Sequence, residues 1–322
     1  MGSIAAAPAR ADDFYHGKTI TVIVGFAPGG GVDTAGRMIA RNLVRFIPGK
    51  PNFVVKNMEG AAGVVAANHL AQRAEPDGLT LAIPGRSWFI EGIMKNPNVV
   101  HDPTKFSYIG SGGIVNSVLR VRSDTGIKNF DDLKAARRTV VFGSLSSATS
   151  TAMVPRMLAA AGMPVQVVLG YVSTARILMA LEQGEVNAVF LPEDSFALKQ
   201  NLVRDNVVVS ILQTRPLLPG VALLGDVLAP QQVAVLSLVC APDAFGLMLV
   251  GPPGVPADRI ELLRKAFVAM TQDQAYLAEA QKLGLPADSP LDGAELTKMI
   301  HDLAVGTTAD VASTYERLRS QK

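Results

Sequence analysis

Cysteine and histidine are scarce in this sequence, and their scarcity excludes several kinds of site. The single cysteine, Cys240, rules out an intramolecular disulfide and any metal site built from several cysteines. We expect it to be a buried, unreactive thiol. The four histidines lie far apart, with no pair four residues apart and no H-E-x-x-H segment, which argues against a zinc site. The sequence therefore predicts neither a metal nor another cofactor.

Long apolar stretches and runs of one charge are also missing. No segment reaches the roughly 18 apolar residues that a membrane-spanning helix needs. The 30 basic and 28 acidic residues are spread along the chain, which argues against a nucleic-acid or membrane-surface partner. With 322 residues, 48% of them hydrophobic, the chain is long enough for two globular domains. We therefore expect its ligands to be small molecules.

The first twelve residues have the character of a tag or of the remnant of a signal peptide. Met1-Gly2-Ser3 resembles an expression scar, and Ala9-Arg10-Ala11 has the small-x-small form of a secretory cleavage site whose hydrophobic region is missing. This pattern predicts a mature exported protein. An ordinary alanine-rich disordered tail is the alternative.

A run of three glycines, Gly29–Gly31, joins a predicted strand to a predicted helix. The strand is the β-branched segment 18–25, and apolar residues at helical spacing from Ala35 to Phe46 indicate the helix. Glycines let the backbone take positive φ and let another group come close, while Asp33 is placed to cap the helix. Since a helix start carries roughly half a positive charge, the turn could hold a carboxylate or phosphate. A tight structural turn without a ligand is the alternative.

Two motifs in this part of the chain resemble those of a known family. The segment VGFAPGGGVDTAGRMIARNL (24–43) resembles the first signature of the Bug family, the periplasmic receptors associated with tripartite tricarboxylate transporters, whose usual pattern is a strand followed by F-x-x-G-G-x-x-D. Pro76-Asp77-Gly78-Leu79-Thr80-Leu81 is similar to that family's P-D-G-Y-T-L. The resemblance continues, more weakly, through residues 131–151 and 249–267, so it covers nearly the whole chain.

The order of predicted elements indicates an α/β protein with two doubly wound sheets. Strands and helices alternate from residue 18 to residue 83, and a second strand, turn and helix, beginning at Thr139, repeats that arrangement. The resemblance implies the two-lobed architecture of periplasmic binding proteins (type II, Venus flytrap), with a ligand cleft between the lobes. It also implies a discontinuous first lobe. We expect lobe 1 at 13–117 and 246–322 and lobe 2 at 118–245.

A second turn rich in hydroxyl groups, 143–151, precedes the helix of the repeated unit. Across a cleft from the first turn it would close a carboxylate between two positive helix ends. The family's turn is richer in glycine and is followed by a histidine. Here Ala148 and Ala152 occupy those positions, while Gly143, Ser144 and Thr149 match the family. The alternative is a solvated serine-rich loop with one helix cap.

Other positions bear on the ligand's chemistry. Tyr171 matches the first residue of the family's Y-K-G, but Phe190-Leu191 stands where the family commonly has F-D. The missing carboxylate implies that the ligand need not carry an ammonium group. Glu193 and Asp194 could substitute for it, although acidic residues that open a helix more often interact with the helix dipole.

Arg86 follows the third strand, where the family more often has a small residue. Its guanidinium could bind a second carboxylate of the ligand, with Trp88 or Phe89 as an apolar wall. The alternative is a surface ion pair with an acidic residue such as Glu91, which would contribute little.

Two enzymatic alternatives lack their motifs. The serines of the second turn do not form a G-x-S-x-G elbow, and no histidine lies in a setting that suggests a general base. Gly29–Gly31 does not form G-x-G-x-x-G, and Lys56-Asn57 stands at the end of the second strand where a dinucleotide site needs an acidic residue.

We therefore expect a periplasmic, monomeric solute receptor without catalytic activity. It would capture a small organic carboxylate and deliver it to the membrane subunits of a tripartite tricarboxylate transporter. An α/β enzyme acting on a carboxylate or phosphate, and a ligand-sensing partner of a membrane sensor kinase, are the alternatives. The residues expected at the ligand are Phe26, Ala27, Gly29, Gly30, Gly31, Asp33, Arg86, Ser87, Trp88, Gly143, Ser144, Ser146, Ser147, Thr149, Tyr171 and Ser173.

Overall fold

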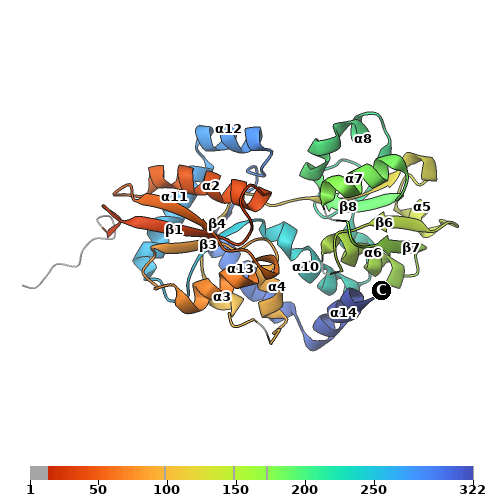
Figure 1. Cartoon of the computed structure of the whole chain (residues 1–322). Coiled ribbons are helices and arrows are strands. Elements are labelled where there is room, and N and C mark those ends of the chain that lie inside the picture. Colours follow the sequence, from red (N-terminus) through yellow and green to blue (C-terminus); the bar gives the residue numbers. More distant parts are fainter. Residues whose placement is uncertain (1–13, 98, 148, 172, 322) are drawn as a thin grey trace, which may run out of the picture. The chain divides into compact units, whose positions relative to one another are not determined.

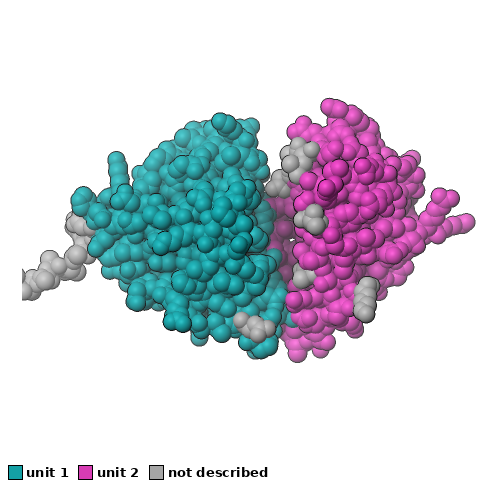
Figure 2. All heavy atoms as spheres, viewed as in Figure 1, with its two compact units in different colours: residues 1–114, 245–304 teal, residues 115–244, 305–322 magenta. Residues whose placement is uncertain are grey.

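The computed structural model describes residues 14–97, 99–147, 149–171 and 173–321, and it divides into two compact units (Figure 1). Unit 1 comprises residues 1–114 and 245–304, and unit 2 comprises residues 115–244 and 305–322, as coloured in Figure 2. The tag or signal remnant expected at 1–12 and the family position Ala148 lie outside the described residues. The side chain of Asp194 is likewise not described.

Unit 1 contains a six-stranded mixed sheet in the order β12-β4-β11-β3-β1-β2. Its strands are β1 (Thr19–Val24), β2 (Asn52–Asn57), β3 (Thr80–Ile83), β4 (Ser107–Ser111), β11 (Met248–Gly251) and β12 (Leu291–Asp292). β1 pairs in parallel with both β2 and β3, whereas β11 runs antiparallel to β3 and β4. The return of the chain through β11 makes the unit discontinuous in sequence.

Helices cover both faces of this sheet. They are α2 (Gly31–Leu43), α3 (Val64–Arg73), α4 (Trp88–Ile93), α11 (Ala257–Thr271), α12 (Gln274–Leu283) and α13 (Gly293–Gly306), with 3-10 turns η1 (Val44–Phe46), η2 (Ala61–Gly63) and η3 (Pro103–Lys105). α2 and α11 lie on one face, and α3 and α4 lie on the other (Figure 1). Met38, Ile39 and Leu43 of α2 are buried in the core, and Gly36 lets the helix approach β1 because a Cβ there would lie 2.7 Å from Val24.

Unit 2 repeats the arrangement with a second six-stranded sheet, in the order β10-β9-β5-β8-β6-β7. Its strands are β5 (Ser117–Arg122), β6 (Val140–Gly143), β7 (Val165–Val168), β8 (Ala188–Pro192), β9 (Val208–Gln213) and β10 (Ala222–Leu223). β6 pairs in parallel with β7 and β8, as β1 does with β2 and β3, while β5 is antiparallel to β8 and β9.

The helices of unit 2 also lie on both faces of its sheet. They are η4 (Ser123–Thr125), α5 (Phe130–Lys134), α6 (Ser150–Ala160), α7 (Thr174–Gln183), η5 (Glu193–Lys199), α8 (Gln200–Arg204), α9 (Leu224–Val227), α10 (Pro230–Phe245) and α14 (Ala309–Ser320). Apolar residues of α7, β8 and η5, among them Ile177, Leu181 and Phe196, form a buried cluster.

The last helix belongs to unit 2, whereas the expected division places 246–322 in the first lobe. The physical reason is Arg156 on α6, which is almost fully buried. Its Nη1 donates to the carbonyl oxygens of Leu318 at 3.0 Å and Arg319 at 3.1 Å. These carbonyls end α14 and have no partner within the helix, so a guanidinium satisfies them and complements the negative end of the helix.

Candidate functional site

The glycine turn and the loop after β3 meet at one edge of the unit 1 sheet. Val24 and Ile83 are paired in register, so the parallel strands β1 and β3 end level with each other. The loops then touch, because a Cβ on Gly25 would lie 2.0 Å from the carbonyl oxygen of Pro84. Segments 29–33 and 84–88, which follow these strands, therefore lie at the same edge of the sheet.

Asp33 fixes the turn, but not as the helix cap that the sequence predicts. α2 begins at Gly31, so Gly30 is the N-cap and Asp33 is the third residue of the helix. From there Asp33 reaches back, as the acidic residue of a capping box does, and its Oδ2 accepts the backbone N–H of Gly29 at 2.9 Å. The same oxygen accepts from Arg37 Nε at 2.9 Å.

Asn57, at the end of β2, completes this network and was not among the predicted residues. Its Nδ2 donates to Asp33 Oδ1 at 2.7 Å and to the carbonyl oxygen of Phe26 at 2.8 Å, and its Oδ1 accepts from Arg37. The hydrogen bond from Arg37, followed by those from Asn57 and Gly29, lowers the pKa of Asp33 to about 2. A polar residue that ends a parallel strand beside the glycine turn was the available signal.

The three glycines are exposed, and only Gly29 has a backbone conformation that favours glycine. Gly29 has φ +83°, but Gly30 is extended with φ −80°, a conformation that other residues adopt. A Cβ on Gly29 or Gly31 would meet nothing within 4 Å, and one on Gly30 would lie 3.7 Å from the nearest atom. No side chain among the described residues caps α2. The first-turn N–H groups therefore face open space that a small anion could enter.

The other predicted residues of unit 1 differ in how far they are exposed to solvent. Ala27 is exposed at the turn, whereas the ring of Phe26 packs over Gly85. Ser87 is exposed and precedes α4. Trp88 is fully buried against Phe106 and His101 in the core, so it supports the loop from beneath instead of forming a wall for the ligand.

Arg86 does not form the surface ion pair considered as its alternative role. It is partly buried, and its Nη1 is buried without a hydrogen-bond partner among the described residues. Glu91, the acidic residue nearest in sequence, accepts a hydrogen bond from Asn96 at 2.7 Å. An arginine that keeps an unpartnered buried nitrogen is available for an anion.

Hydroxyl groups of the second turn mostly bind one another. Thr151 Oγ1 lies 2.6 Å from Ser144 Oγ and 2.7 Å from Thr149 Oγ1, and Ser144 is fully buried. Thr149 is the N-cap of α6, but its side chain does not cap the helix and donates to the carbonyl oxygen of Ser146 instead. Ser146 is exposed and Ser147 is half-buried. The second turn therefore also leaves a helix start without a side-chain cap.

The residues after β7 lie beside this turn, as their match to the family suggests. The backbone N–H of Tyr171 donates to the carbonyl oxygen of Ser144 at 3.3 Å. Its hydroxyl donates to Glu185 at 2.6 Å, and burial together with that carboxylate raises the pKa of Tyr171 to about 12. Ser173 caps α7 by accepting the N–H of Arg176 at 3.3 Å. Both side chains are thus already engaged within the unit.

Gly143 and Glu193 are each held by neighbours in unit 2. A Cβ on Gly143 would lie 3.2 Å from Ile177 and 3.3 Å from Tyr171, so packing alone favours a glycine there. Glu193 pairs with the buried Arg120 at 2.8 Å. Because Glu193 is engaged in this ion pair, it does not take the place of the carboxylate that the family commonly has after Phe190.

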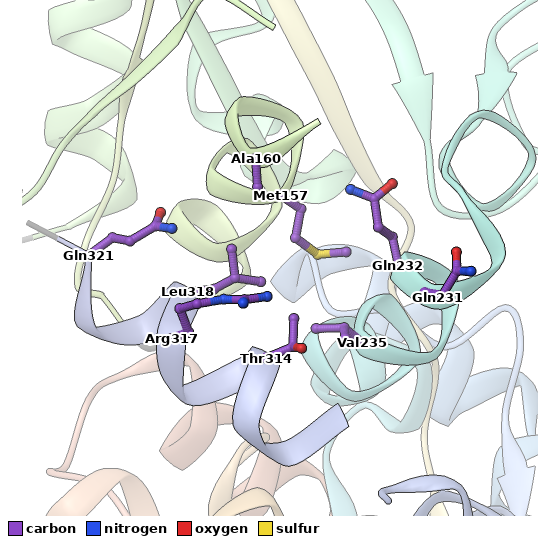
Figure 3. Close-up of a pocket in the computed structure, with 9 residues that line it drawn as sticks. All are labelled: Met157, Ala160, Gln231, Gln232, Val235, Thr314, Arg317, Leu318 and Gln321. Carbon is purple, nitrogen blue, oxygen red and sulfur yellow. The ribbon is translucent and has the colours of Figure 1, made fainter. Parts of the chain in front are cut away.

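A hollow of unit 2 lies elsewhere, among α6, α10 and α14 (Figure 3). Its volume is about 420 Å³, and side chains of three glutamines, a threonine and an arginine share its wall with apolar residues. None of these residues belongs to the second turn. Two hollows of about 450 and 390 Å³ in unit 1, against α11, also lack the predicted residues.

Two kinds of feature are not found in the described part of the chain. No group of three or more histidine, cysteine, aspartate or glutamate residues there could hold a metal ion. No helix of those residues is both long and apolar enough to cross a membrane.

Comparison with known sequences finds a family and several relatives. The family model described as "ABC transporter, phosphonate, periplasmic substrate-binding protein" matches residues 110–288, more than half of the chain. A UPF0065 protein of Agrobacterium vitis is 31% identical over 157 residues, which cover 47% of this chain and 44% of the relative. BugT of Bordetella pertussis is 42% identical over 82 residues, or 26% of this chain and 24% of that protein. The chain thus spans less than half the length of these relatives.

Comparison with solved structures identifies the fold. A TctC solute-binding protein from Polaromonas matches with a TM-score of 0.70 and 16% identity, over 94% of this chain and 97% of that one. MatC from Rhodopseudomonas palustris with bound malate matches with a TM-score of 0.59 and 21% identity, over 94% and 99%. Another R. palustris protein, with adipate, has a TM-score of 0.60 and 18% identity, over 93% and 97%. These neighbours and the two mixed sheets show the two-lobed α/β fold of a solute-binding protein.

Proposed function

The chain belongs to the periplasmic substrate-binding proteins of the matching family model, and its relatives place it in the Bug family, so we propose that it captures a small organic carboxylate. The family model names phosphonate, and two of the structural neighbours hold malate and adipate. Phosphonates and carboxylates are both small oxyanions, which backbone N–H groups at a helix start can bind. A carboxylate is therefore the ligand class that the neighbours and the site have in common.

The observation that carries the proposal is the uncapped start of α2. The chain leaves its first-turn N–H groups without a side-chain partner and keeps glycines where a Cβ would meet only open space. At Gly30 and Gly31, which do not have positive φ, neither feature helps the fold, because glycine raises the entropic cost of folding and an Ncap side chain would stabilise the helix. An anion that approaches the backbone closely would account for both features.

We propose that the second turn also serves the ligand. Ser146 and Ser147 have the accessible hydroxyls there, while Ser144 and Thr149 hold the shape of the turn through Thr151. Under this proposal the role of Tyr171 and Ser173 is to position the neighbouring backbone, since their side chains are engaged. The expected cleft between the lobes stays a prediction.

The proposed role is delivery to the membrane subunits of a tripartite tricarboxylate transporter, with the receptor acting as a periplasmic monomer. The family and the fold are those of transport receptors and not of enzymes. A role beside a sensor kinase would use the same binding step. Growth of a strain lacking the receptor on the bound acid would separate uptake from signalling, because only loss of uptake abolishes growth on that acid.

The test is to block the open space without changing the fold, by Gly30→Val. Gly30 has an ordinary φ and an unobstructed Cβ position, so we expect the free energy of unfolding to change by less than about 1 kcal/mol. Binding should be abolished in calorimetric titrations of a panel of mono-, di- and tricarboxylates. Gly225→Val is the matched control, because Gly225 also has open space around its Cβ position and lies on the short helix α9.

Two results would contradict the proposal. One is a Gly30→Val protein that binds the acid as tightly as the wild type, which would make the turn structural. The other is a wild-type protein that converts the bound acid during long incubation, as followed by mass spectrometry, since a receptor returns its ligand unchanged.

A further inference from the structure

A small cavity in unit 1 is lined by two residues that each keep a buried hydrogen-bond donor without a partner among the described residues. It has a volume of about 20 Å³, and Arg86 and Tyr276 are its polar side chains. Arg86 Nη1 and Tyr276 Oη are both buried and unpartnered among the described residues. Since at least nine in ten buried polar groups in proteins are hydrogen-bonded, two such donors at one cavity call for an occupant.

The wall of the cavity supplies no counter-charge. Apart from Arg86, Tyr276 and the backbone of Gly112 and Gly113, its described lining is apolar, with residues such as Met38 and Leu285. None of the described lining residues is acidic. A guanidinium nitrogen buried in such surroundings loses hydration that only an anion restores in full, because a water molecule accepts the hydrogen bond but carries no charge.

Tyr276 is placed as a neutral donor. It lies on α12 with its side chain fully buried, and burial raises its pKa to about 12. Its hydroxyl is packed so closely that a Cβ on Gly112 would lie 2.5 Å from Oη. A glycine is therefore needed at residue 112 to make room for the hydroxyl at the cavity.

We propose that the Arg86–Tyr276 cavity is a small-anion site that accepts one oxygen of a second acid group on the ligand. This deepens the proposed carboxylate receptor and rests on it. The cavity has space for about one or two water-sized atoms, which is enough for a carboxylate oxygen. Ala35, one turn beyond the start of α2, also lines it, so it lies on the helix whose start would hold the first acid group.

A free monovalent anion has the same chemistry, and the experiment distinguishes the two sources. Calorimetry would compare succinate with butyrate, and adipate with hexanoate, on the wild type, Arg86→Gln and Tyr276→Phe. If the ligand supplies the anion, each variant should lower the preference for the diacid by roughly tenfold or more, while binding of the monoacid hardly changes. Arg73→Gln on the exposed end of α3 is the control and should leave the preference unchanged.

The second arm follows the melting temperature in sodium chloride and in sodium gluconate at equal ionic strength. If a free anion fills the cavity, chloride should stabilise the wild type more than gluconate does, and both variants should lose that difference. Tyr276→Phe removes only the hydroxyl, so it keeps the test valid if Arg86→Gln fails to fold. Unchanged diacid preference together with an unchanged chloride response in both variants would overturn the proposal. A wild type that binds no carboxylate would refute the proposed function alone, because the chloride arm still tests the cavity.

Discussion

Asp33 shows how one side chain can hold the shape of the glycine turn. It joins the backbone before α2 to Arg37 and Asn57, and its side chain is nearly inaccessible to solvent. We expect Asp33→Asn to lower the free energy of unfolding by about 1.5–3 kcal/mol, the range for hydrogen bonds to a charged group, and to weaken carboxylate binding. Urea unfolding and calorimetry measure the two effects. Asp131→Asn, on an exposed ion pair, should change neither.

The pH dependence of that contribution follows from the direction of the pKa shift. The folded pKa of Asp33 is about 2, below its ordinary value of 3.8. Its stabilising effect is therefore present above pH 4 and is lost as the pH falls through 2. The Asn variant should lack this part of the acid transition, and an identical acid transition in both proteins would contradict the assignment.

His101 is a base whose pKa is lowered, and like Asp33 it makes the protein less stable at acidic pH. It is buried among Trp88 and Phe106, its Nδ1 lies 2.7 Å from Asn68 Oδ1, and burial lowers its pKa from 6.5 to about 4. The unfolded chain therefore binds a proton more readily, so stability should fall as the pH decreases from 6.5 to 4.

Substitution of this histidine provides the measurement. His101→Gln should reduce the slope of unfolding free energy against pH in that window, as followed by chemical denaturation at a series of pH values. His301→Gln is the control, because His301 is exposed. Equal slopes for the wild type and His101→Gln would show that the buried ring does not titrate as described.

Among the elements, α14 is anchored through one residue of α6. Arg156 donates to the carbonyl oxygens of Leu318 and Arg319 and, at 3.3 Å, to that of Ser147 in the second turn. We expect Arg156→Leu to cost roughly 1–3 kcal/mol and to speed amide hydrogen exchange in residues 309–320. Exchange followed by mass spectrometry would detect this, with Arg137→Leu, on an exposed side chain, as the control. If amide protection in α14 of the Arg156→Leu protein equals that of the wild type, the apolar residues of the helix are enough to keep it in place.

The sequence predicted the elements around the site better than the side-chain roles. The second strand was predicted to end at Lys56-Asn57, and β2 ends there; β1 lies within the predicted segment 18–25. Both agree because the pattern of apolar and β-branched residues in a strand is a local property of the sequence. The role of Asp33 depended on where α2 begins, which a glycine run does not fix. The burial of Trp88 depended on the rotation of a six-residue helix.

Contacts between distant parts of the chain were not predictable in the same way. Arg156 and the end of α14 are more than 160 residues apart, and no pattern in one sequence links them. Tyr276 lies on α12, far from Arg86 in the sequence. Its approach to Arg86 arises from the packing of α12 against α2, a tertiary property.

For the whole molecule, ligand binding should be visible as a gain in stability. A ligand that binds only the folded protein stabilises it by RT ln(1 + [L]/Kd), about 2.7 kcal/mol at a hundredfold excess over Kd. We expect a carboxylate from the panel to raise the melting temperature accordingly, and closure of the two lobes to lower the radius of gyration in solution scattering. The carboxylate-receptor proposal would be refuted if nucleotides or sugars raised the melting temperature and no acid of the panel did.

The uncapped start of α2 also bears on how this protein could change its ligand during evolution. Every residue except proline carries the same backbone N–H, so the proposed binding of an acid group does not depend on the identity of a side chain at the turn. Mutations of other residues around the ligand can then change which substituents of the acid fit, while the backbone still binds the acid group. Under the proposed function, related receptors can therefore acquire specificity for different acids through single mutations while every intermediate protein still binds an acid.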